Sequence, residues 1–337
     1  MTTCLRCGVL FLLGSLMGLA QGWQSEQQLW SGNGSNGDQK ITCAAFPGTT
    51  ETVCVFEIGS TIYEHLYEID SSDGGVTWTS PVQITNDSTS EFDCSIRADN
   101  ARGRLSLIYS RNGVAGGNDI EIRHKTCSSC GWTGPTAVIA DGHNNWDASL
   151  LVAGNGDLLV IETLEGPDGN GSPGTIHSFR STDGGTTWGA RASIISTSGQ
   201  QWYPVAVQKS DGVIHLMFRD TTYSSNAQIG QMWSSDYGYT WTGFSNFMFN
   251  GSQQQLFSFI GTQGGINLTV LASIAGTVHH WQSWDNGNTW EGPYVTSSVS
   301  PAQDAEFSIG CRGVIFTFTG PNTSAYERRY DWYTSCQ

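Results

Sequence analysis

The sequence predicts an all-β fold, and more specifically a six-bladed β-propeller of four-stranded antiparallel blades. The composition joins tight-turn and strand-forming residues, with 42 glycines, 13 tryptophans and only 13% charged residues. A short string that ends in tryptophan recurs along the chain, and its spacing gives a period of about 50 residues, which is in the range of propeller blades. Each period contains short β-rich runs separated by turn residues.

The recurring string has four clear copies and one degenerate copy. The clear copies are SSDGGVTW at 71–78, STDGGTTW at 181–188, SSDYGYTW at 234–241 and SWDNGNTW at 283–290. The degenerate copy, KTCSSCGW, ends at Trp132 and fills the double-length gap between the first two. Aspartate accepts backbone hydrogen bonds in its own turn, glycine adopts angles that other residues resist, and tryptophan packs the turn onto a sheet. We therefore interpret the string as a structural turn between the third and fourth strands of each unit.

The first two strands of each unit are also visible in the sequence. They correspond to the stretches 41–57, 93–110, 147–162, 203–219, 256–273 and 304–320. The sixth unit lacks its own last strand, and the segment SEQQLW at 25–30 precedes the first unit. We expect the two chain ends to share the last blade and to close the ring, because closure removes exposed strand edges.

The string SxDxGxTW resembles the Asp-box of the sialidase superfamily, and its copies extend over most of residues 23–337. This resemblance implies a propeller with the Asp-boxes on one face and the active pocket on the opposite face. It also implies a glycoside hydrolase of the sialidase or exo-arabinanase type. The first unit has ITCAAFPG where sialidases carry an Arg-Ile-Pro string, so we do not transfer sialic-acid specificity.

Polar residues on the predicted active face define the candidate site. This face receives the start of each first strand and the end of each second strand. The starts offer Asp93, Asp147, Tyr203 and Asp304, and the ends offer Glu57, Tyr109, Arg111, Glu162, Arg219 and Asp220. Counted from the glycine before each second strand, Glu162 is level with Tyr109 and Phe218. A carboxylate at a position where sibling units carry aromatic residues is the sharpest anomaly against the repeat.

Glycosidic cleavage usually needs one carboxylic acid to protonate the leaving oxygen and a second group as base or nucleophile, which is a tyrosine in sialidases. We therefore predict that the catalytic residues come from Glu162, Asp220, Asp93 and Asp147. Two arginines are expected to hold the sugar, and three aromatic residues complete the predicted binding set: Arg111, Arg219, Tyr203, Tyr109 and Trp146.

The same residues also have a structural interpretation, as solvated loop residues or as the repeated residue at which each first strand begins. The chain would then be a propeller that binds glycans without cleaving them, or an extracellular assembly module. A lectin of this kind usually repeats its site in every blade. The polar positions differ from unit to unit, which favours one asymmetric pocket and hence an enzyme.

The N-terminus predicts secretion. Arg6 is followed by the apolar run GVLFLLGSLMGLA, so we expect a signal peptide at 1–22 and a single domain at 23–337, with no membrane span. Six Asn-x-Ser/Thr sequons fit a secreted glycoprotein. The net charge of −15, with only 15 lysines and arginines, excludes a nucleic-acid partner. The expected partner is a carbohydrate; no cofactor or metal is expected, and the oligomeric state stays open.

Seven cysteines follow the predicted cleavage point, and in an oxidising compartment most should pair. Cys127 and Cys130 lack a second CxxC or a histidine pair, so a local disulfide is favoured over zinc. A bond between Cys311 and Cys336 would fix the C-terminus. The pairing of Cys43, Cys54 and Cys94 is left open.

Overall fold

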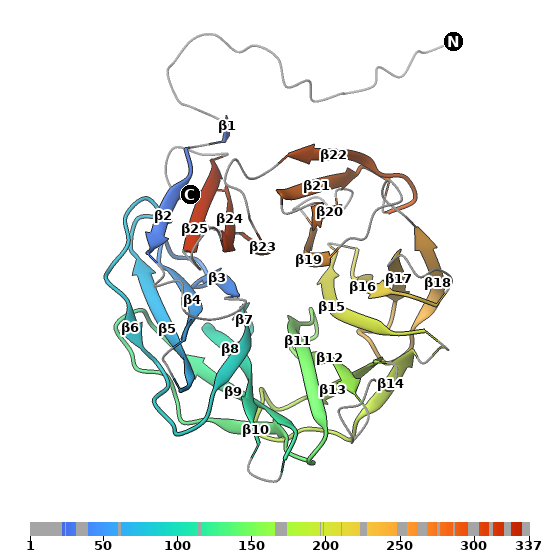
Figure 1. The fold of residues 1–337 in the computed structure, drawn as a ribbon, viewed down its shortest axis with the longest axis horizontal. Helices are drawn as coiled ribbons and strands as arrows, with labels where there is room; N and C mark the ends of the chain where they lie inside the picture. Colours follow the sequence, from blue (N-terminus) through green and yellow to red (C-terminus); the bar gives the residue numbers. More distant parts are fainter. Residues whose placement is uncertain are drawn as a thin grey trace.

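The structure is a computed structural model in which strands and turns surround a central axis (Figure 1). It describes residues 22–23, 25–31, 40–59, 62–113, 116–165, 174–195, 197, 199–209, 211–222, 228–247, 255–261, 268–274, 277–285, 287–295, 303–309, 313–319 and 325–331. Within these residues every regular element is a β-strand, and no helix is long and apolar enough to cross a membrane.

Each predicted stretch forms an antiparallel pair of strands, and the next strands extend it into a unit. The first unit contains β3 (Ile41–Ala45), β4 (Thr52–Gly59), β5 (Glu64–Ser71) and β6 (Val82–Gln83). The fourth contains β15 (Gln201–Gln208), β16 (Ile214–Asp220), β17 (Gln228–Ser234) and β18 (Thr242–Phe247). The fifth contains β19 (Gln255–Gly261), β20 (Leu268–Ile274), β21 (Thr277–Ser283) and β22 (Glu291–Val295).

The second and third units are joined into one eight-stranded sheet. The second contains β7 (Glu91–Asp99), β8 (Arg104–Asn112), β9 (Asn118–Lys125) and β10 (Thr136–Ile139). The third contains β11 (Asn144–Val152), β12 (Leu158–Glu165), β13 (Thr175–Ser181) and β14 (Ala192–Ile195). A single parallel bridge between Asn144 and Asn118 joins them, a contact that the repeat pattern does not predict.

The C-terminal strands form a sheet with the N-terminal ones. It contains β23 (Gln303–Ile309), β24 (Gly313–Thr319) and β25 (Ala325–Asp331), and both β1 (Gly22–Trp23) and β2 (Gln27–Trp30) pair with β25. The innermost strands β3, β7, β11, β15, β19 and β23 contact one another in order, and β23 also contacts β3 (Figure 1). The first strand of every unit therefore faces the axis.

The core consists of apolar layers between neighbouring units. One layer packs Val53, Val55 and Leu66 of the first unit against Leu105 and Leu107 of the second. Further layers lie between the second and third units and between the third and fourth. Burial of both sheet faces fixes the strand register, because a slip of one residue would turn each apolar set toward the wrong neighbour.

The tryptophan-ended strings form the turns between third and fourth strands, as predicted. In the first turn, Asp73 Oδ1 accepts the Val76 and Thr77 backbone N–H groups at 2.9 Å each, and Oδ2 accepts the Thr77 hydroxyl at 2.7 Å. Ser71 Oγ accepts the Gly75 N–H, and Gly75 has a φ of 88° that few other residues adopt. Although partial burial acts in the opposite direction, the hydrogen bonds from Thr77 and Ser71 lower the pKa of Asp73 to about 2.

Substitution Asp73→Ala is expected to lower the midpoint of thermal unfolding by a few degrees, because four hydrogen-bond donors, among them the Ser71 hydroxyl, lose their acceptor. Since the native pKa is about 2, the contribution of the carboxylate is present above the unfolded pKa near 4 and is lost as the pH falls through about 2. Calorimetry at neutral pH provides the measurement, with Asp73→Asn, which keeps Oδ1, as the milder matched variant. An unchanged midpoint in Asp73→Ala would contradict the structural role.

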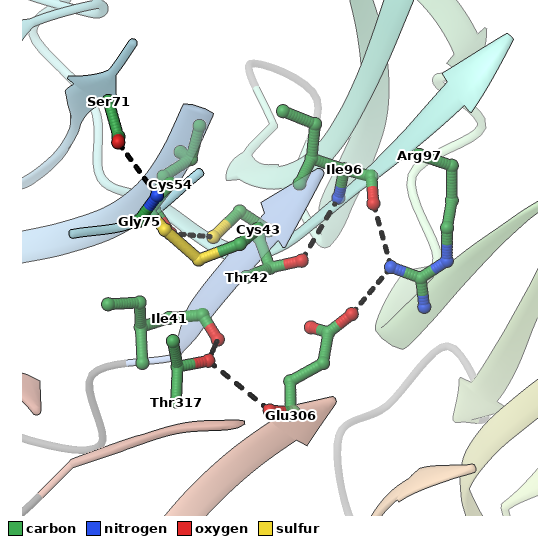
Figure 2. The surroundings of a disulfide bond; sticks show 12 residues. Ile41, Thr42, Cys43, Cys54, Ser71, Gly75, Ile96, Arg97, Glu306 and Thr317 are labelled. Atoms are coloured by element: carbon green, nitrogen blue, oxygen red, sulfur yellow. Dashed lines mark hydrogen bonds and ion pairs between the residues drawn. A yellow bond between two sulfur atoms is a disulfide. The ribbon is translucent and has the colours of Figure 1, made fainter. Parts of the chain in front are cut away.

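The cysteines are partly as expected. The local disulfide between Cys127 and Cys130 is confirmed. A second disulfide joins Cys43 and Cys54, which are direct partners on β3 and β4 (Figure 2). Cys94 is buried and free, and burial raises the pKa of its thiol well above the usual value. The predicted bond between Cys311 and Cys336 lies outside the described residues.

Candidate functional site

The inner strands begin with the same irregularity in three successive units. Asp93, Asp147 and Tyr203 have φ values of 54°, 52° and 55°. At each of them the pairing with the second strand shifts, between Phe92 and Ser95, Trp146 and Ser149, and Trp202 and Val205. Bulges re-aim side chains, and left-handed backbone at non-glycine residues is uncommon and concentrates at functional sites. These predicted site residues thus occupy one repeated, strained position beside the axis.

Two of these residues are directly connected. The backbone N–H of Asp147 on β11 donates to Asp93 Oδ2 on β7 at 3.4 Å. On the other side of β7, the backbone N–H of Cys94 donates to Glu57 Oε1 at 3.4 Å. The structure therefore brings Glu57, Asp93 and Asp147 together from three neighbouring units.

The charges around these carboxyl groups are strongly coupled. Burial, together with the nearby charges of Asp93 and Glu64, raises the pKa of Glu57 well above its usual value. Burial alone would lower the pKa of Lys40, but the charges of Asp93, Glu306 and Asp147 raise it. A carboxyl whose pKa is raised, a lysine ammonium group and further carboxylates thus lie close together, which is the environment in which acid and base roles separate.

An arginine crosses the axis-facing side of the first unit. Arg97 Nη1 on β7 donates to Glu306 Oε1 on β23 at 2.5 Å and to the Ile96 carbonyl oxygen at 2.7 Å (Figure 2). Between these two strands lies β3, whose Thr42 hydroxyl accepts the Ile96 N–H at 3.3 Å. The ion pair therefore links the second unit to the last sheet across the first, and Glu306 also acts on Lys40.

Glu162 occupies the level predicted from the glycine count. Ile108, Ile161 and Met217 pair with equivalent residues after the bulge, so the next residues, Tyr109, Glu162 and Phe218, are equivalent. The tyrosine and the phenylalanine belong to the apolar layers between units. Glu162 is the equivalent residue of the third unit, and it lies on β12 opposite the bulge that contains Asp147 on β11.

The carboxyl of Glu162 is fully buried, and an arginine from the loop before β14 holds it. Arg191 Nε donates to Glu162 Oε1 at 2.9 Å, while its other nitrogens contact Asp141 and Asn145 at 2.8 and 2.5 Å. Oε2 is buried without a hydrogen bond among the described residues. Burial raises the pKa of Glu162 to about 7, although Arg191 opposes the shift.

We expect Glu162 to make the free energy of unfolding depend on pH. The unfolded chain ionises this carboxyl near pH 4.3, whereas the native pKa is about 7. The stabilising contribution of this carboxyl to the free energy of unfolding is therefore fully present below about pH 4. It falls by up to about 3 kcal/mol as the pH rises through 7. Denaturant unfolding at pH 5 and pH 8 should show this loss in the natural protein and not in Glu162→Gln. Glu165→Gln, on the same strand, is the matched control, and an equal pH dependence in all three proteins would refute the assignment.

The predicted substrate-binding residues of the second unit form a separate network. The Tyr109 hydroxyl donates to Glu121 Oε2 at 2.7 Å and accepts from Arg123 Nε at 2.9 Å. Arg111 Nη1 donates to Glu121 Oε1 at 2.8 Å. Both predicted residues thus contact one carboxylate on β9.

The remaining predicted residues lie near the ends of their strands. Asp220 is fully buried, and its Oδ1 accepts from Gln201 Nε2 and the Thr222 hydroxyl at 2.8 and 2.6 Å. Arg219 pairs with Trp202 across the sheet. Trp146 donates from Nε1 to Glu165 at 2.9 Å and packs against Phe92. Asp304 lies on β23, but its side chain is outside the described residues.

The sequence analysis did not predict that Lys40 and Glu306 lie near Asp93 and Asp147. Lys40 precedes β3 and belongs to no periodic run, and Glu306 follows the bulge of a distant strand. The packing of β7 and β23 against β3 brings them to Asp93. Among the described residues, no three His, Cys, Asp or Glu side chains are grouped so that they could hold a metal ion.

Solved structures with the same fold include glycoside hydrolases. A Penicillium chrysogenum α-L-arabinanase complexed with arabinobiose superimposes with a TM-score of 0.68 at 15% identity, covering 91% of this chain and 98% of that one. The chain has the β-propeller fold of arabinanases and sialidases. Trypanosoma rangeli sialidase in complex with 2,3-difluorosialic acid gives a TM-score of 0.67 at 14% identity, covering 93% of this chain and 59% of that one.

A sialidase from the Hadza microbiome gives a TM-score of 0.66 at 14% identity, and this propeller spans 65% of its length. No protein-family model matches the sequence, and neither does any curated protein. At these identities the likeness establishes the fold, while the chemistry depends on the residues of this chain.

Proposed function

We propose that this chain is a secreted glycoside hydrolase that acts from the axial cluster of Glu57, Asp93 and Asp147. The observation that carries the proposal is the pair of left-handed aspartates on adjacent inner strands, joined at 3.4 Å. We further infer six blades of four strands, with β2 completing the last one beside β25, because the terminal strands pair there. Such a ring presents the starts of all inner strands around one opening.

The proposed chemistry divides between the two aspartates. Asp93 accepts a backbone hydrogen bond from Asp147, which suits a carboxylate acting as base or nucleophile. Asp147 then protonates the glycosidic oxygen of the leaving group. Glu57 is a positioning residue: its buried carboxyl anchors the Cys94 N–H beside Asp93, and its raised pKa keeps a second negative charge away from that carboxylate. Glu162 and Asp220, both fully buried, support the blades around this site.

The substrate we favour is a neutral glycan such as an arabinan. An acidic sugar needs unpaired cationic groups, but Arg97 and Arg111 are already bound to Glu306 and Glu121 at 2.5 and 2.8 Å. The axial cluster also carries more carboxylates than cations, which repels an acidic substrate. The near-complete coverage of the arabinanase and the missing Arg-Ile-Pro string are consistent with this choice.

Secretion is part of the same proposal. The apolar N-terminal run and the disulfides Cys43–Cys54 and Cys127–Cys130 both suit an oxidising extracellular compartment.

A screen of the purified protein against arabinans, sialosides and acidic polysaccharides tests the function. We expect release of a neutral sugar from the chain end, measured by chromatography of the products. Release of sialic acid would overturn the substrate choice. Glycan binding without any release, measured by calorimetry with the same panel, would instead establish the glycan-binding propeller that was the alternative interpretation.

A further inference from the structure

A cavity opens on the Asp-box face, at the opposite end of the strands from the axial cluster. It has a volume of about 360 Å³ and lies between the first Asp-box turn and the loop closed by the Cys127–Cys130 disulfide. Asp70, Thr77 and Trp78 line it from the first unit, and Ser128 and Ser129 line it from the second. The degenerate copy of the repeat is therefore one wall of this cavity.

Asp70 is the charged group in the wall of this cavity, and its bonding is incomplete. Its Oδ1 is buried and has no hydrogen-bond partner among the described residues. The neighbouring cation, Lys125 Nζ, is 3.9 Å away and already donates to both oxygens of Glu68 at 2.8 and 2.9 Å. Burial, together with the charge of Glu68, raises the pKa of Asp70 to about 6, although Lys125 opposes the shift.

The equivalent position in the third unit shows which chemical group can occupy the space between two neighbouring units. Asp70 and Arg180 each precede the Asp-box serine, and they pair with equivalent residues of the second strand. Arg180 reaches the next Asp-box, donates to the Tyr237 carbonyl oxygen at 2.6 Å and stacks 3.8 Å from the centre of the Tyr239 ring. A guanidinium group thus bridges the third and fourth units. Between the first and second units, the residue at this position is a short carboxylate beside a cavity.

We propose that this cavity binds an organic cation, an ammonium or guanidinium group of a small ligand, with Asp70 as its counter-ion. Negative charge predominates around Asp70, because Glu68 and Glu51 act on its carboxyl and, among the described residues, Lys125 is the cation that opposes them. The ligand donates to the exposed part of the Asp70 carboxylate, whose side chain is 23% exposed. The hydroxyls of Thr77 and the two serines accept its remaining N–H groups, and Trp78 supplies an aromatic wall. The site is independent of the axial cluster and of glycan hydrolysis.

Calorimetric titration of the full chain with agmatine and with glucosamine tests the site and separates its two sources, a guanidinium compound and an amino sugar. We expect saturable one-site binding of at least one of them, and none of N-acetylglucosamine, the neutral match to glucosamine. Asp70→Asn should weaken the binding roughly tenfold or more, because a charge-assisted hydrogen bond is lost. Binding of agmatine, whose guanidinium group stays charged throughout, should also weaken between pH 8 and pH 5, because burial raises the pKa of Asp70 to about 6.

Asp211→Asn is the matched control, since Asp211 is an exposed carboxylate on the same face in the fourth unit. Ser129→Trp, which fills the cavity without changing a charge, should abolish binding even if Asp70→Asn affects the fold. Absence of saturable binding by both cations, or equal affinity in Asp70→Asn and Asp211→Asn, would overturn the proposal. Glycan hydrolysis should be unchanged in all of these variants, so failure here leaves the proposed function untouched.

Discussion

Substitution Asp147→Asn is expected to reduce glycan hydrolysis about a thousandfold, because general acid catalysis contributes factors of this order. Asp93→Asn should have a similar effect, since it removes the proposed base or nucleophile. Asparagine is the appropriate replacement at both positions, where φ is 52° and 54°, because it tolerates left-handed backbone and alanine does not. The measurement is kcat on the substrate identified by the screen, with binding affinity determined in parallel.

The matched control for these variants is Glu291→Gln, which changes an exposed carboxylate on β22. We expect it to keep full activity. Both aspartate variants should still bind the glycan, because the change affects proton transfer more than contact with the sugar. If Asp93→Asn and Asp147→Asn retain activity while Glu162→Gln loses it, catalysis belongs to the third-unit position and the axial site is refuted.

The fold was largely predictable because its signals are local. The Asp-box turn bonds within itself, as Ser71, Asp73 and Thr77 show, so its sequence specifies its structure wherever it occurs. The same locality allowed the glycine count to align Tyr109 with Glu162, an equivalence that the strand register confirms. The parallel bridge between Asn118 and Asn144 has no such signal, because it depends on how two units approach each other.

The site was predictable only in part. Position at the start of an inner strand identified Asp93 and Asp147, and the structure gives both the same strained bulge. Glu162 was singled out as an anomaly against the repeat, but its hydrogen-bond partner Arg191 lies 29 residues away on a loop and was not predicted. Contacts such as Arg97 with Glu306, which are 209 residues apart, arise from the packing of β7 and β23 against β3. Sequence periodicity predicts which residues face a neighbouring unit, but it does not predict which charged residue of that unit they contact.

Substitution Lys125→Met is expected to lower the free energy of unfolding by about 3–5 kcal/mol, the usual effect of removing one partner of a buried ion pair. Lys125 is 1% exposed and stands where a complete Asp-box has serine. Its ammonium group is bonded to both oxygens of Glu68, which also accepts the Trp132 indole N–H at 2.8 Å. Without Lys125, the buried Glu68 carboxylate keeps only the Trp132 hydrogen bond and has no counter-ion, next to Asp70. Denaturant unfolding gives the measurement.

Lys209→Met is the matched control, because Lys209 is also buried but its partner Asp211 is 47% exposed and can be hydrated instead. We expect a loss of no more than about 1 kcal/mol there. The double variant Lys125→Met, Glu68→Gln should recover much of the lost stability, since the neutral amide can still accept from Trp132 and no charge stays buried. Equal losses in the two lysine variants, or no recovery in the double variant, would contradict this explanation. The stability would then come from packing of the lysine side chain between the first and second units, and not from its charge pairing with Glu68.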